Sequence, residues 1–195
     1  MAMVNRSRYE VDIKGLHLVM ETDPALFSPT AADRGTLAMI STVEIQPGQR
    51  LLDLGCGCGI VGVWASLSGA DAVLTDVDPR ALDCARHNLA VNGCGPCRCY
   101  ESDGFRQLNE TGFDWILTNP PYHSDYAVAK HFVEKGFNRL VTGGRMVLVV
   151  KKPDWYRNKL RAIFGGFSDR QIDGYHVLTA EKRSDTYQHK RQEPE

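Results

Sequence analysis

A glycine-rich turn within residues 50–59 is the first stretch whose residue types and spacing suggest chemistry. The apolar run 51–54 predicts a buried strand, and an apolar helix pattern starts at Ile60. Glycines between them let the backbone turn tightly and approach a ligand, and the exposed amides of a helix start favour anionic or polar groups. We expect a ligand to contact the acid and the three glycines of this turn, which are Asp53, Gly55, Gly57 and Gly59.

The second such stretch is Asn119-Pro120-Pro121-Tyr122, which follows the apolar run 113–118. A residue before proline is pushed out of the helical region, and two prolines fix the backbone and remove two donors. The result is a stiff turn whose carbonyl groups point outward. Asn119 adds a side-chain carbonyl and Tyr122 adds an aromatic face, so the turn offers hydrogen-bond acceptors beside a stacking surface.

The elements around these turns predict a doubly wound α/β fold. A strand, a glycine-rich turn and a helix form the first unit of such a sheet, whose ligands bind beyond the carboxyl ends of the strands. We expect a mostly parallel, seven-stranded, Rossmann-like sheet, preceded by a β-hairpin at 7–21 and a helix over about 32–44 capped by Ser28 or Thr30. The strands predicted for the sheet are 51–54, 72–76, 98–101, 113–118, 145–150, 167–174 and 175–182, and its last two helices are predicted at 126–141 and 154–164.

Acidic residues at the ends of the second and third of these strands favour a nucleotide-like ligand. Asp76, which Val77 follows, ends the second strand, where an acid accepts hydrogen bonds from ribose hydroxyls. Asp103 and Gly104 come after the third strand. Asp103 either accepts a hydrogen bond from an adenine amino group or caps a short helix over 105–109.

Two ligand classes fit the glycine turn. Gly57-x-Gly59-x-x-Gly62 matches the dinucleotide fingerprint and would indicate a nicotinamide oxidoreductase. Asp53 would then face the pyrophosphate and repel it, whereas the same carboxylate suits the ammonium of a methionine moiety. A third class is a scaffold of the same fold without turnover, which would have no need of Asn119 and Tyr122.

Length and composition indicate one soluble domain. The chain has 195 residues, of which 43% are hydrophobic and 24% are charged, and its net charge of −1 gives no global attraction to nucleic acid or membrane. We expect a single domain over 1–183, with the hairpin and helix in 1–45 and the sheet in 46–183, and a disordered tail over 184–195. No signal sequence or membrane span is expected, which predicts a cytoplasmic protein.

A cysteine cluster invites a metal interpretation that its spacing does not support. Cys94, Cys97 and Cys99 lie close in sequence, but a zinc site usually takes four ligands from two paired clusters. No second pair is present, so we expect incidental thiols and no metal.

The two turns together resemble those of class I S-adenosylmethionine-dependent methyltransferases that modify amines. The segments 26–28 and 34–36, together with His123 after Tyr122, resemble the small-domain family of ribosomal RNA guanine 2-amino methyltransferases. The resemblance implies S-adenosylmethionine as cofactor and an RNA substrate. It implies that Asn119 and Pro120 hold the target amine and that Tyr122 stacks on the base. The implied cofactor-binding residues are Asp53, Gly55, Gly57, Gly59, Asp76, Val77, Asp103, Gly104 and Asn119, and the substrate-binding residues are Pro121, Tyr122, His123, Lys151 and Lys152.

The choice of substrate leaves alternatives open. Bacterial members of that family often carry a second, degenerate copy of the domain, for which this chain is too short. Protein-glutamine and adenine methyltransferases share the Asn-Pro-Pro-aromatic turn, and a small-molecule acceptor is a further alternative. Lys151 and Lys152 follow the strand at 145–150 and favour RNA, because lysines beside an aromatic platform would hold phosphates around a base. Three later basic residues, Arg157, Lys159 and Arg161, are better explained as a solvated helix face.

Overall fold

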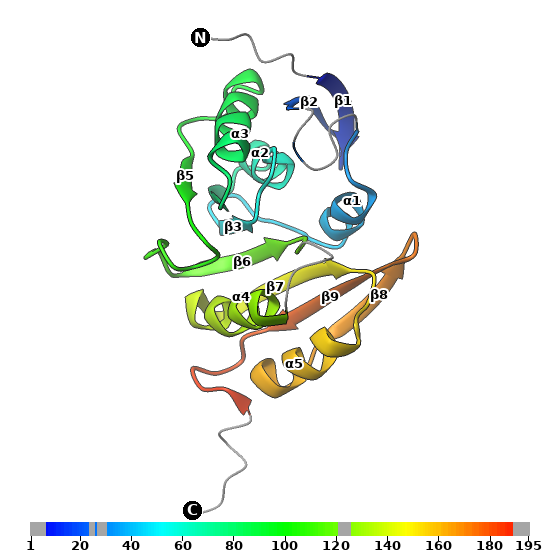
Figure 1. Ribbon diagram of the computed structural model, residues 1–195, viewed down its shortest axis with the longest axis vertical. Coiled ribbons are helices and arrows are strands. Elements are labelled where there is room, and N and C mark those ends of the chain that lie inside the picture. The colour runs from blue at the N-terminus through cyan, green and yellow to red at the C-terminus, as the bar shows by residue number, and fades with distance from the viewer. Residues whose placement is uncertain (1–6, 24–25, 27–30, 121–125, 189–195) are drawn as a thin grey trace, which may run out of the picture.

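The computed structural model of the chain describes residues 7–23, 26, 31–120 and 126–188. It contains a seven-stranded sheet in the order β5-β4-β3-β6-β7-β9-β8 and a separate β1-β2 hairpin (Figure 1). The predicted doubly wound α/β class is therefore confirmed. In chain order the elements are β1 (Ser7–Ile13), β2 (Leu16–Thr22), α1 (Arg34–Ser41), β3 (Arg50–Leu54), α2 (Ile60–Leu67), β4 (Asp71–Asp76), α3 (Pro79–Val91), β5 (Arg98–Glu101), β6 (Phe113–Thr118), α4 (Tyr126–Arg139), β7 (Leu140–Val150), α5 (Asp154–Phe164), β8 (Ser168–Ile172) and β9 (Tyr175–Glu181).

The order of the strands fixes where a ligand site opens. β5, β4, β3, β6 and β7 are parallel to one another, whereas β9 is antiparallel to both β7 and β8. The chain moves outward from β3 to β4 and β5, and then returns to β6 on the other side of β3. In such sheets a crevice opens at the carboxyl ends of the strands where the order reverses. Here those are the ends of β3 and β6, so the glycine turn and Asn119 lie at the same edge.

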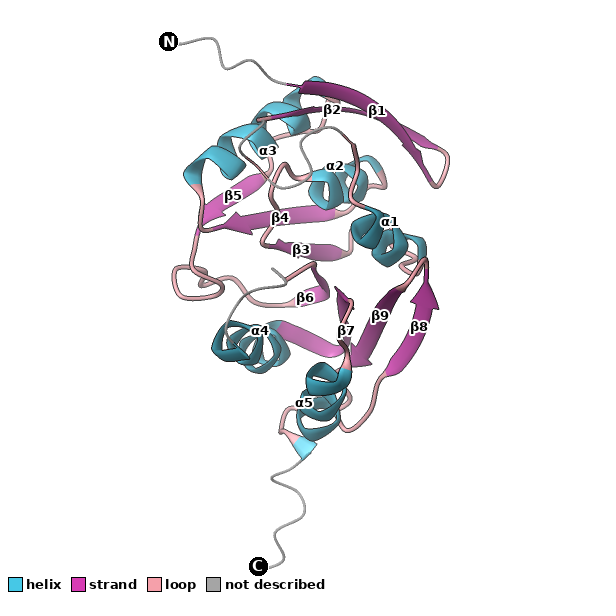
Figure 2. Cartoon of the chain, turned by 45° about the vertical axis from the view of Figure 1, so that its right-hand side comes forward, coloured by secondary structure: helices cyan, strands magenta, loops and turns pink. Residues whose placement is uncertain are grey.

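Alternating residues of the strands bury the two faces of the sheet against different helices. Leu51 packs into a core with residues of the hairpin and of α1, α2 and α3, whereas Leu52 packs into a second core with α4 and α5. The same alternation separates Leu74 from Val73. Figure 2 shows α4 and α5 on one side of the sheet and the other helices and the hairpin on the opposite side. No described helix has the length and hydropathy required to cross a bilayer.

The N-terminal hairpin, predicted at 7–21, is attached to α3 by two carboxamide side chains. Asn88 Oδ1 accepts a hydrogen bond from the backbone N–H of Glu21 at 2.8 Å, and Asn88 Nδ2 donates to the Glu21 carbonyl at 2.9 Å. Asn92 forms the same pair of bonds with Val19, at 2.9 and 2.7 Å. The two side chains therefore satisfy the outer edge of β2 as a neighbouring strand would.

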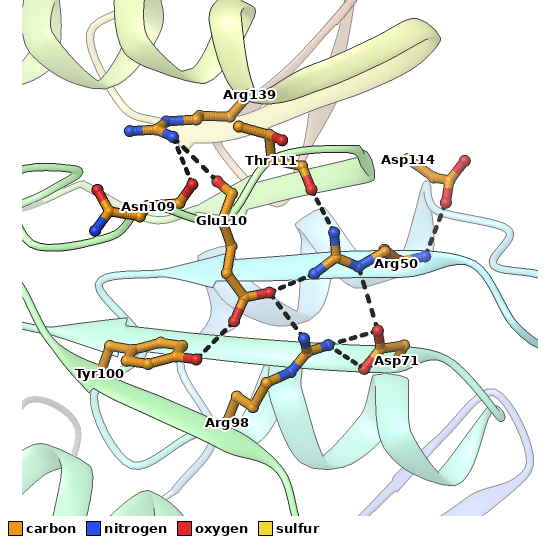
Figure 3. Close-up of polar contacts among 9 residues, drawn as sticks. All are labelled: Arg50, Asp71, Arg98, Tyr100, Asn109, Glu110, Thr111, Asp114 and Arg139. Carbon is orange, nitrogen blue, oxygen red and sulfur yellow. Dashed lines mark hydrogen bonds and ion pairs between the residues drawn. The ribbon is translucent and has the colours of Figure 1, made fainter.

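Charged side chains cross-link the amino-terminal ends of the strands, opposite the edge where the glycine turn and Asn119 lie (Figure 3). Glu110 accepts hydrogen bonds from both Arg50 and Arg98, and the Tyr100 hydroxyl donates to it at 2.7 Å. Asp71 pairs with the same two arginines. This network ties the starts of β3, β4 and β5 to the loop before β6, away from the ligand edge.

Several predicted boundaries are wrong for local reasons. Asp33, rather than Ser28 or Thr30, caps α1, because its side chain accepts the Thr36 N–H at 2.8 Å. Ser28 and Thr30 lie outside the described residues. The predicted helix at 126–141 ends at Arg139 instead, because β7 begins at Leu140.

Gly143 and Gly144, a pair typical of a helix end, lie inside β7. The Gly143 N–H donates to the Lys182 carbonyl at 2.7 Å, and the Lys182 N–H donates to the Gly144 carbonyl at 2.9 Å, so the pairing of β7 with β9 continues through Lys182 to both glycines. The predicted disordered tail over 184–195 includes a residue that packs against the domain. Tyr187 packs against Phe137 with 5.0 Å between ring centroids, and its hydroxyl donates to the Glu134 carbonyl at 3.1 Å.

Candidate active site

A cavity of about 580 Å³ opens at the carboxyl ends of β3 and β6. It extends from the ends of β4 and β5 across the glycine turn to α1, and the hairpin supplies one side chain of its wall. Nine of the described residues that the sequence singles out line it, which are Asp53, Gly55, Gly57, Asp76, Val77, Asp103, Gly104, Asn119 and Pro120. The fold therefore gathers residues from four predicted strand ends into one space.

The glycine turn presents its backbone to the cavity. Gly55 and Gly57 have φ angles of +74° and +53°, and a Cβ added at either position would meet no atom within 4 Å. A side chain there would project into open space that a ligand could occupy. Gly59 differs, because it does not line the cavity and an added Cβ would lie 2.8 Å from the Ala85 Cβ. Gly59 thus serves the packing of α2 against α3, which departs from the cofactor contact expected for it.

Asp76 holds the glycine turn in place as well as lining the cavity. Its Oδ2 accepts the Gly57 N–H at 2.8 Å, and its Oδ1 accepts the Asp78 N–H at 3.0 Å. Each carboxylate oxygen has two lone pairs, so both retain capacity for a ligand hydroxyl. Val77 is 65% exposed and places an apolar side chain at the same end of the cavity.

Asp53 is buried in the cavity wall, with 3% of its surface exposed. Its Oδ2 accepts the Gly62 N–H at 3.1 Å, which caps α2 because Gly59 at the N-cap has no side chain to do so. Burial, with a smaller contribution from the nearby Asp76 charge, raises the pKa of Asp53 to about 7, although the Gly62 hydrogen bond acts in the opposite direction. A cationic ligand group beside this carboxylate would therefore stabilise its charged form.

The loop after β5 forms the far end of the cavity. The helix expected over 105–109 is absent from these described residues, so Asp103 caps no helix, and its carboxylate pairs with Arg106 at 2.7 Å. The Phe105 N–H donates to His131 Nε2 of α4 at 3.3 Å, which fixes the loop against that helix. Burial, followed by the charges of Arg106 and Lys135, lowers the pKa of His131 and favours the neutral ring that accepts this bond.

Asn119 comes directly after β6 and is held by the start of α1. Its Nδ2 donates to Asp33 Oδ2 at 2.8 Å and to Thr36 Oγ1 at 3.0 Å. The neighbouring Thr118 hydroxyl is buried and has no hydrogen-bond partner among the described residues, although Thr118 lines the cavity. Pro121, Tyr122 and His123, expected at the substrate, lie outside the described residues.

The basic residues expected near the cleft lie at the same edge of the sheet but do not line the cavity. Lys151 and Lys152 follow β7 and are exposed, and the Lys151 ammonium lies 5.1 Å from the centre of the Tyr175 ring. The three basic residues of α5 have partners within the chain. Arg157 pairs with Asp169 at 2.6 Å, Lys159 pairs with Glu134, and the Arg161 guanidinium lies 5.4 Å from the centre of the Phe167 ring.

Three cavity residues, Tyr9, Asp33 and Met39, carry no sequence motif that would have identified them, and Thr36 lies in the segment 34–36 but was assigned no role at the site. Tyr9 reaches the cavity from β1, and burial, followed by its interaction with Cys58, raises its pKa. Thr36 and Met39 come from α1, and Asp33 is its N-cap. These residues lie far from the two turns in sequence, and only the topology brings them to the ligand edge. Among the described residues no cluster of metal-ligating side chains occurs, and all six cysteines are free thiols.

Comparison with protein families places the site in context. Residues 17–179 match the model of the methyltransferase small domain. Ribosomal RNA small subunit methyltransferase C of Chromohalobacter salexigens is 34% identical over 179 residues, which are 88% of this chain and 51% of the relative. Ribosomal RNA large subunit methyltransferase G of Pseudomonas putida is 30% identical over 82% of this chain and 44% of the relative. The chain thus spans about half the length of the curated relatives it matches.

Two solved methyltransferase structures are also similar to this chain. A 16S rRNA N2 methyltransferase of T. thermophilus, in complex with AdoMet and guanosine, superposes with a TM-score of 0.84 at 30% identity, over 91% of this chain and 51% of that one. A methyltransferase from Pyrococcus furiosus superposes with a TM-score of 0.69 at 22% identity, over 85% of this chain and 89% of that one, and shows the shared fold.

Proposed function

Because the chain belongs to the methyltransferase small domain family, we propose that it is an S-adenosylmethionine-dependent N-methyltransferase acting on an exocyclic amine. The favoured acceptor is the 2-amino group of guanine in ribosomal RNA, and the corresponding site of action is the cytoplasm. The observation that carries the proposal is one cavity lined by both the Asp53–Gly57 turn and Asn119-Pro120. The guanosine complex of the T. thermophilus neighbour supports the choice of base.

The described residues fit the proposed cofactor. Gly55 and Gly57 leave room beside the backbone, as close contact with a ligand requires. Asp76 ends β4, where ribose hydroxyls need an acceptor, and Val77 and Gly104 flank a site for the adenine ring. Asp53 is placed to interact with an ammonium, directly or through water.

The chemistry assigned to the protein is positioning of the acceptor. The cofactor supplies a methyl group on a sulfonium, and the leaving group is a neutral thioether that keeps the electron pair of the broken C–S bond. The acceptor nitrogen contributes the lone pair of the new N–C bond and loses one proton to solvent. Asn119 Oδ1 and the Pro120 carbonyl accept hydrogen bonds from the two N–H groups of the acceptor amine. These bonds turn the nitrogen lone pair toward the methyl group and stabilise the positive charge that develops on the nitrogen. No strong base is needed before transfer.

The substrate side of the proposal includes residues outside the described part of the chain. Tyr122 and Pro121 would stack on the base, and His123 is a candidate relay for the released proton. Lys151 and Lys152 would contact phosphates near the site. Because the chain is about half as long as its relatives, its recognition of a whole ribosomal substrate is part of the proposal.

A nicotinamide cofactor suits the geometry less well. The fingerprint would use the N–H groups around Gly62 for a pyrophosphate, but the Gly62 N–H is already bonded to the Asp53 carboxylate. A Cβ at Gly62 would lie 2.5 Å from Leu74, so this glycine serves helix–strand packing. Titration with NAD and with S-adenosylmethionine separates the two classes directly.

The test is methyl transfer followed by identification of the product. Purified protein is incubated with methyl-labelled cofactor and either ribosomal RNA or small ribosomal subunits, and the digested nucleosides are resolved by mass spectrometry. The proposal predicts N2-methylguanosine, and Asn119→Ala should lower kcat by about 100-fold or more with little change in cofactor affinity. Label in adenine, in protein glutamine or in a small molecule would reassign the acceptor. Binding of cofactor with no transfer to any of these would favour the scaffold.

A further inference from the structure

The N-terminal residues of α1 fix the orientation of the Asn119 side chain. An asparagine amide has an oxygen that accepts and a nitrogen that donates, and the two ends have nearly the same shape. An amine acceptor site needs the oxygen toward the substrate. The hydrogen bonds around Asn119 determine which end faces α1.

Asp33 gives these bonds one direction. A carboxylate only accepts hydrogen bonds, and Asp33 Oδ2 accepts from Thr36 N at 2.8 Å, from Thr36 Oγ1 at 3.1 Å and from Asn119 Nδ2 at 2.8 Å. Because the single hydroxyl hydrogen of Thr36 is directed to Asp33, Thr36 Oγ1 accepts the second hydrogen of Asn119, at 3.0 Å. Both N–H bonds of the amide are then used. Oδ1 is left as the remaining polar atom of the side chain, on a residue that lines the cavity.

The local sequence is adapted to this arrangement. Asp33 has an extended backbone, with φ −64° and ψ 129°, so its side chain folds back over the first turn of α1. A Cβ added at Gly35 would lie 3.0 Å from Asp33 Oδ2 and 2.9 Å from the Tyr175 ring, so a larger residue there would displace the carboxylate. Thr36 is 7% exposed, which protects its hydroxyl from competing water.

We propose that Asp33, assisted by Thr36, is the positioning residue that locks Asn119 with its carbonyl oxygen toward the acceptor amine. This inference rests on the proposed function, because it gives a role to Asn119 in that reaction. The two bonds hold the amide against rotation. The negative charge on the donor side also makes the carbonyl oxygen a stronger acceptor.

A substitution at Asp33 that preserves the cap of α1 separates its effect on the orientation of Asn119 from its effect on the stability of the protein. Asp33→Ser keeps an oxygen that can cap α1, but the shorter side chain does not reach Asn119. Asp78→Ser is the matched control, since Asp78 caps α3 through the Arg80 N–H at 2.9 Å and does not line the cavity. We expect Asp33→Ser to lower kcat by about 100-fold while its cofactor Kd stays within about twofold of wild type. Asp78→Ser should retain the wild-type kcat and have a melting temperature similar to that of Asp33→Ser.

A charge exchange gives a readout that a structural role would not move. Asn119→Asp places a carboxylate against Asp33, which repels it, so this variant should be nearly inactive. Asp33→Asn/Asn119→Asp supplies an amide donor to the new carboxylate and again leaves an oxygen for the amine. We expect the double variant to be at least about tenfold more active than Asn119→Asp alone, the usual scale for one charged contact.

A measurement without substrate distinguishes failure of the lock from failure of the proposed function. NMR of the Asn119 side-chain amide, assigned by its loss in Asn119→Asp, should show two slowly exchanging protons in the wild type and faster exchange in Asp33→Ser. An unchanged amide signal in Asp33→Ser, or a double variant no more active than Asn119→Asp, would overturn the inference. A locked amide in a wild-type protein that transfers no methyl group would instead overturn the proposed function, and the inference with it.

Discussion

Removal of the Asn88 side chain should destabilise the protein through two backbone groups, one buried and one partly buried. Asn88 is fully buried and serves as partner to the Glu21 N–H and to the Cys58 carbonyl, at 2.8 and 2.9 Å. The Glu21 carbonyl keeps the Cys84 thiol as a second partner at 3.0 Å. Each buried group left without a partner costs about 1–3 kcal/mol, so Asn88→Ala should lower the free energy of unfolding by about 3 kcal/mol.

The assay is urea unfolding under reducing conditions, followed by far-UV circular dichroism and analysed by linear extrapolation. The expected loss corresponds to a fall in Tm of roughly 6–12 °C for a domain of this size. Asn92→Ala is the matched control, because Asn92 makes the same bidentate contact with Val19 but is only half-buried. Water can replace its side chain, so we expect a loss of about 1 kcal/mol.

The comparison of the two variants decides the argument. Equal losses in Asn88→Ala and Asn92→Ala would show that burial of the backbone groups does not set the cost. A loss below about 0.5 kcal/mol in Asn88→Ala, within the range of ordinary surface substitutions, would show that the hairpin is not held by this side chain. A changed m-value would indicate that the hairpin detaches before the rest of the domain unfolds.

Three further predictions concern the ligand edge. Because the pKa of Asp53 is raised to about 7, the stability associated with its protonated form is present at low pH and is lost as the pH rises through 7. A bound ammonium would lower that pKa, so calorimetry should show that cofactor affinity rises with pH up to about 7 and that binding releases protons. Asp53→Asn should abolish this pH dependence. Gly57→Ala should weaken cofactor binding with a stability cost of about 1 kcal/mol, whereas Gly59→Ala should mainly lower Tm, because its Cβ meets Ala85; the reverse pattern would exchange their roles. Lys151→Glu/Lys152→Glu should weaken RNA binding and its salt dependence without changing cofactor affinity, and equal RNA binding by the double variant would remove both lysines from the substrate site.

The sheet and its ligand edge were predictable because their signals are local. Each of the predicted strands at 51–54, 72–76 and 113–118 is short and apolar, and a polar residue or a glycine marks its end. Asp78 and Pro79 are equally local signals, because an N-cap residue type followed by proline is typical of a helix start, and in the structure they are the N-cap and first residue of α3. Motif spacing along one chain segment is thus sufficient to identify the strand ends that converge on the cavity.

Features that depend on distant partners were not predictable. Asn88 resembles any polar helix residue, and its bond to Glu21 spans 67 positions of sequence. The pair Gly143 and Gly144 is typical of a helix end, yet both glycines form backbone hydrogen bonds with Lys182, which follows β9. Residue type does not single out Asp33 as the cap of α1, because Ser28 and Thr30 are equally good N-cap types, and its contact with Asn119 is what distinguishes it.

The attachment of the hairpin to α3 has a consequence for the order of folding. Ribosomes synthesise β1 and β2 well before α3, and an isolated two-stranded hairpin is at best marginally stable in water. Its outer edge stays unpaired until Asn88 and Asn92 have been made and a loop of 67 positions has closed. Tyr9, which depends on the hairpin, therefore reaches the cavity late. A segment made before the core sheet thus completes the ligand site only after α3 has formed, and in the interval its open edge is available for pairing with other chains.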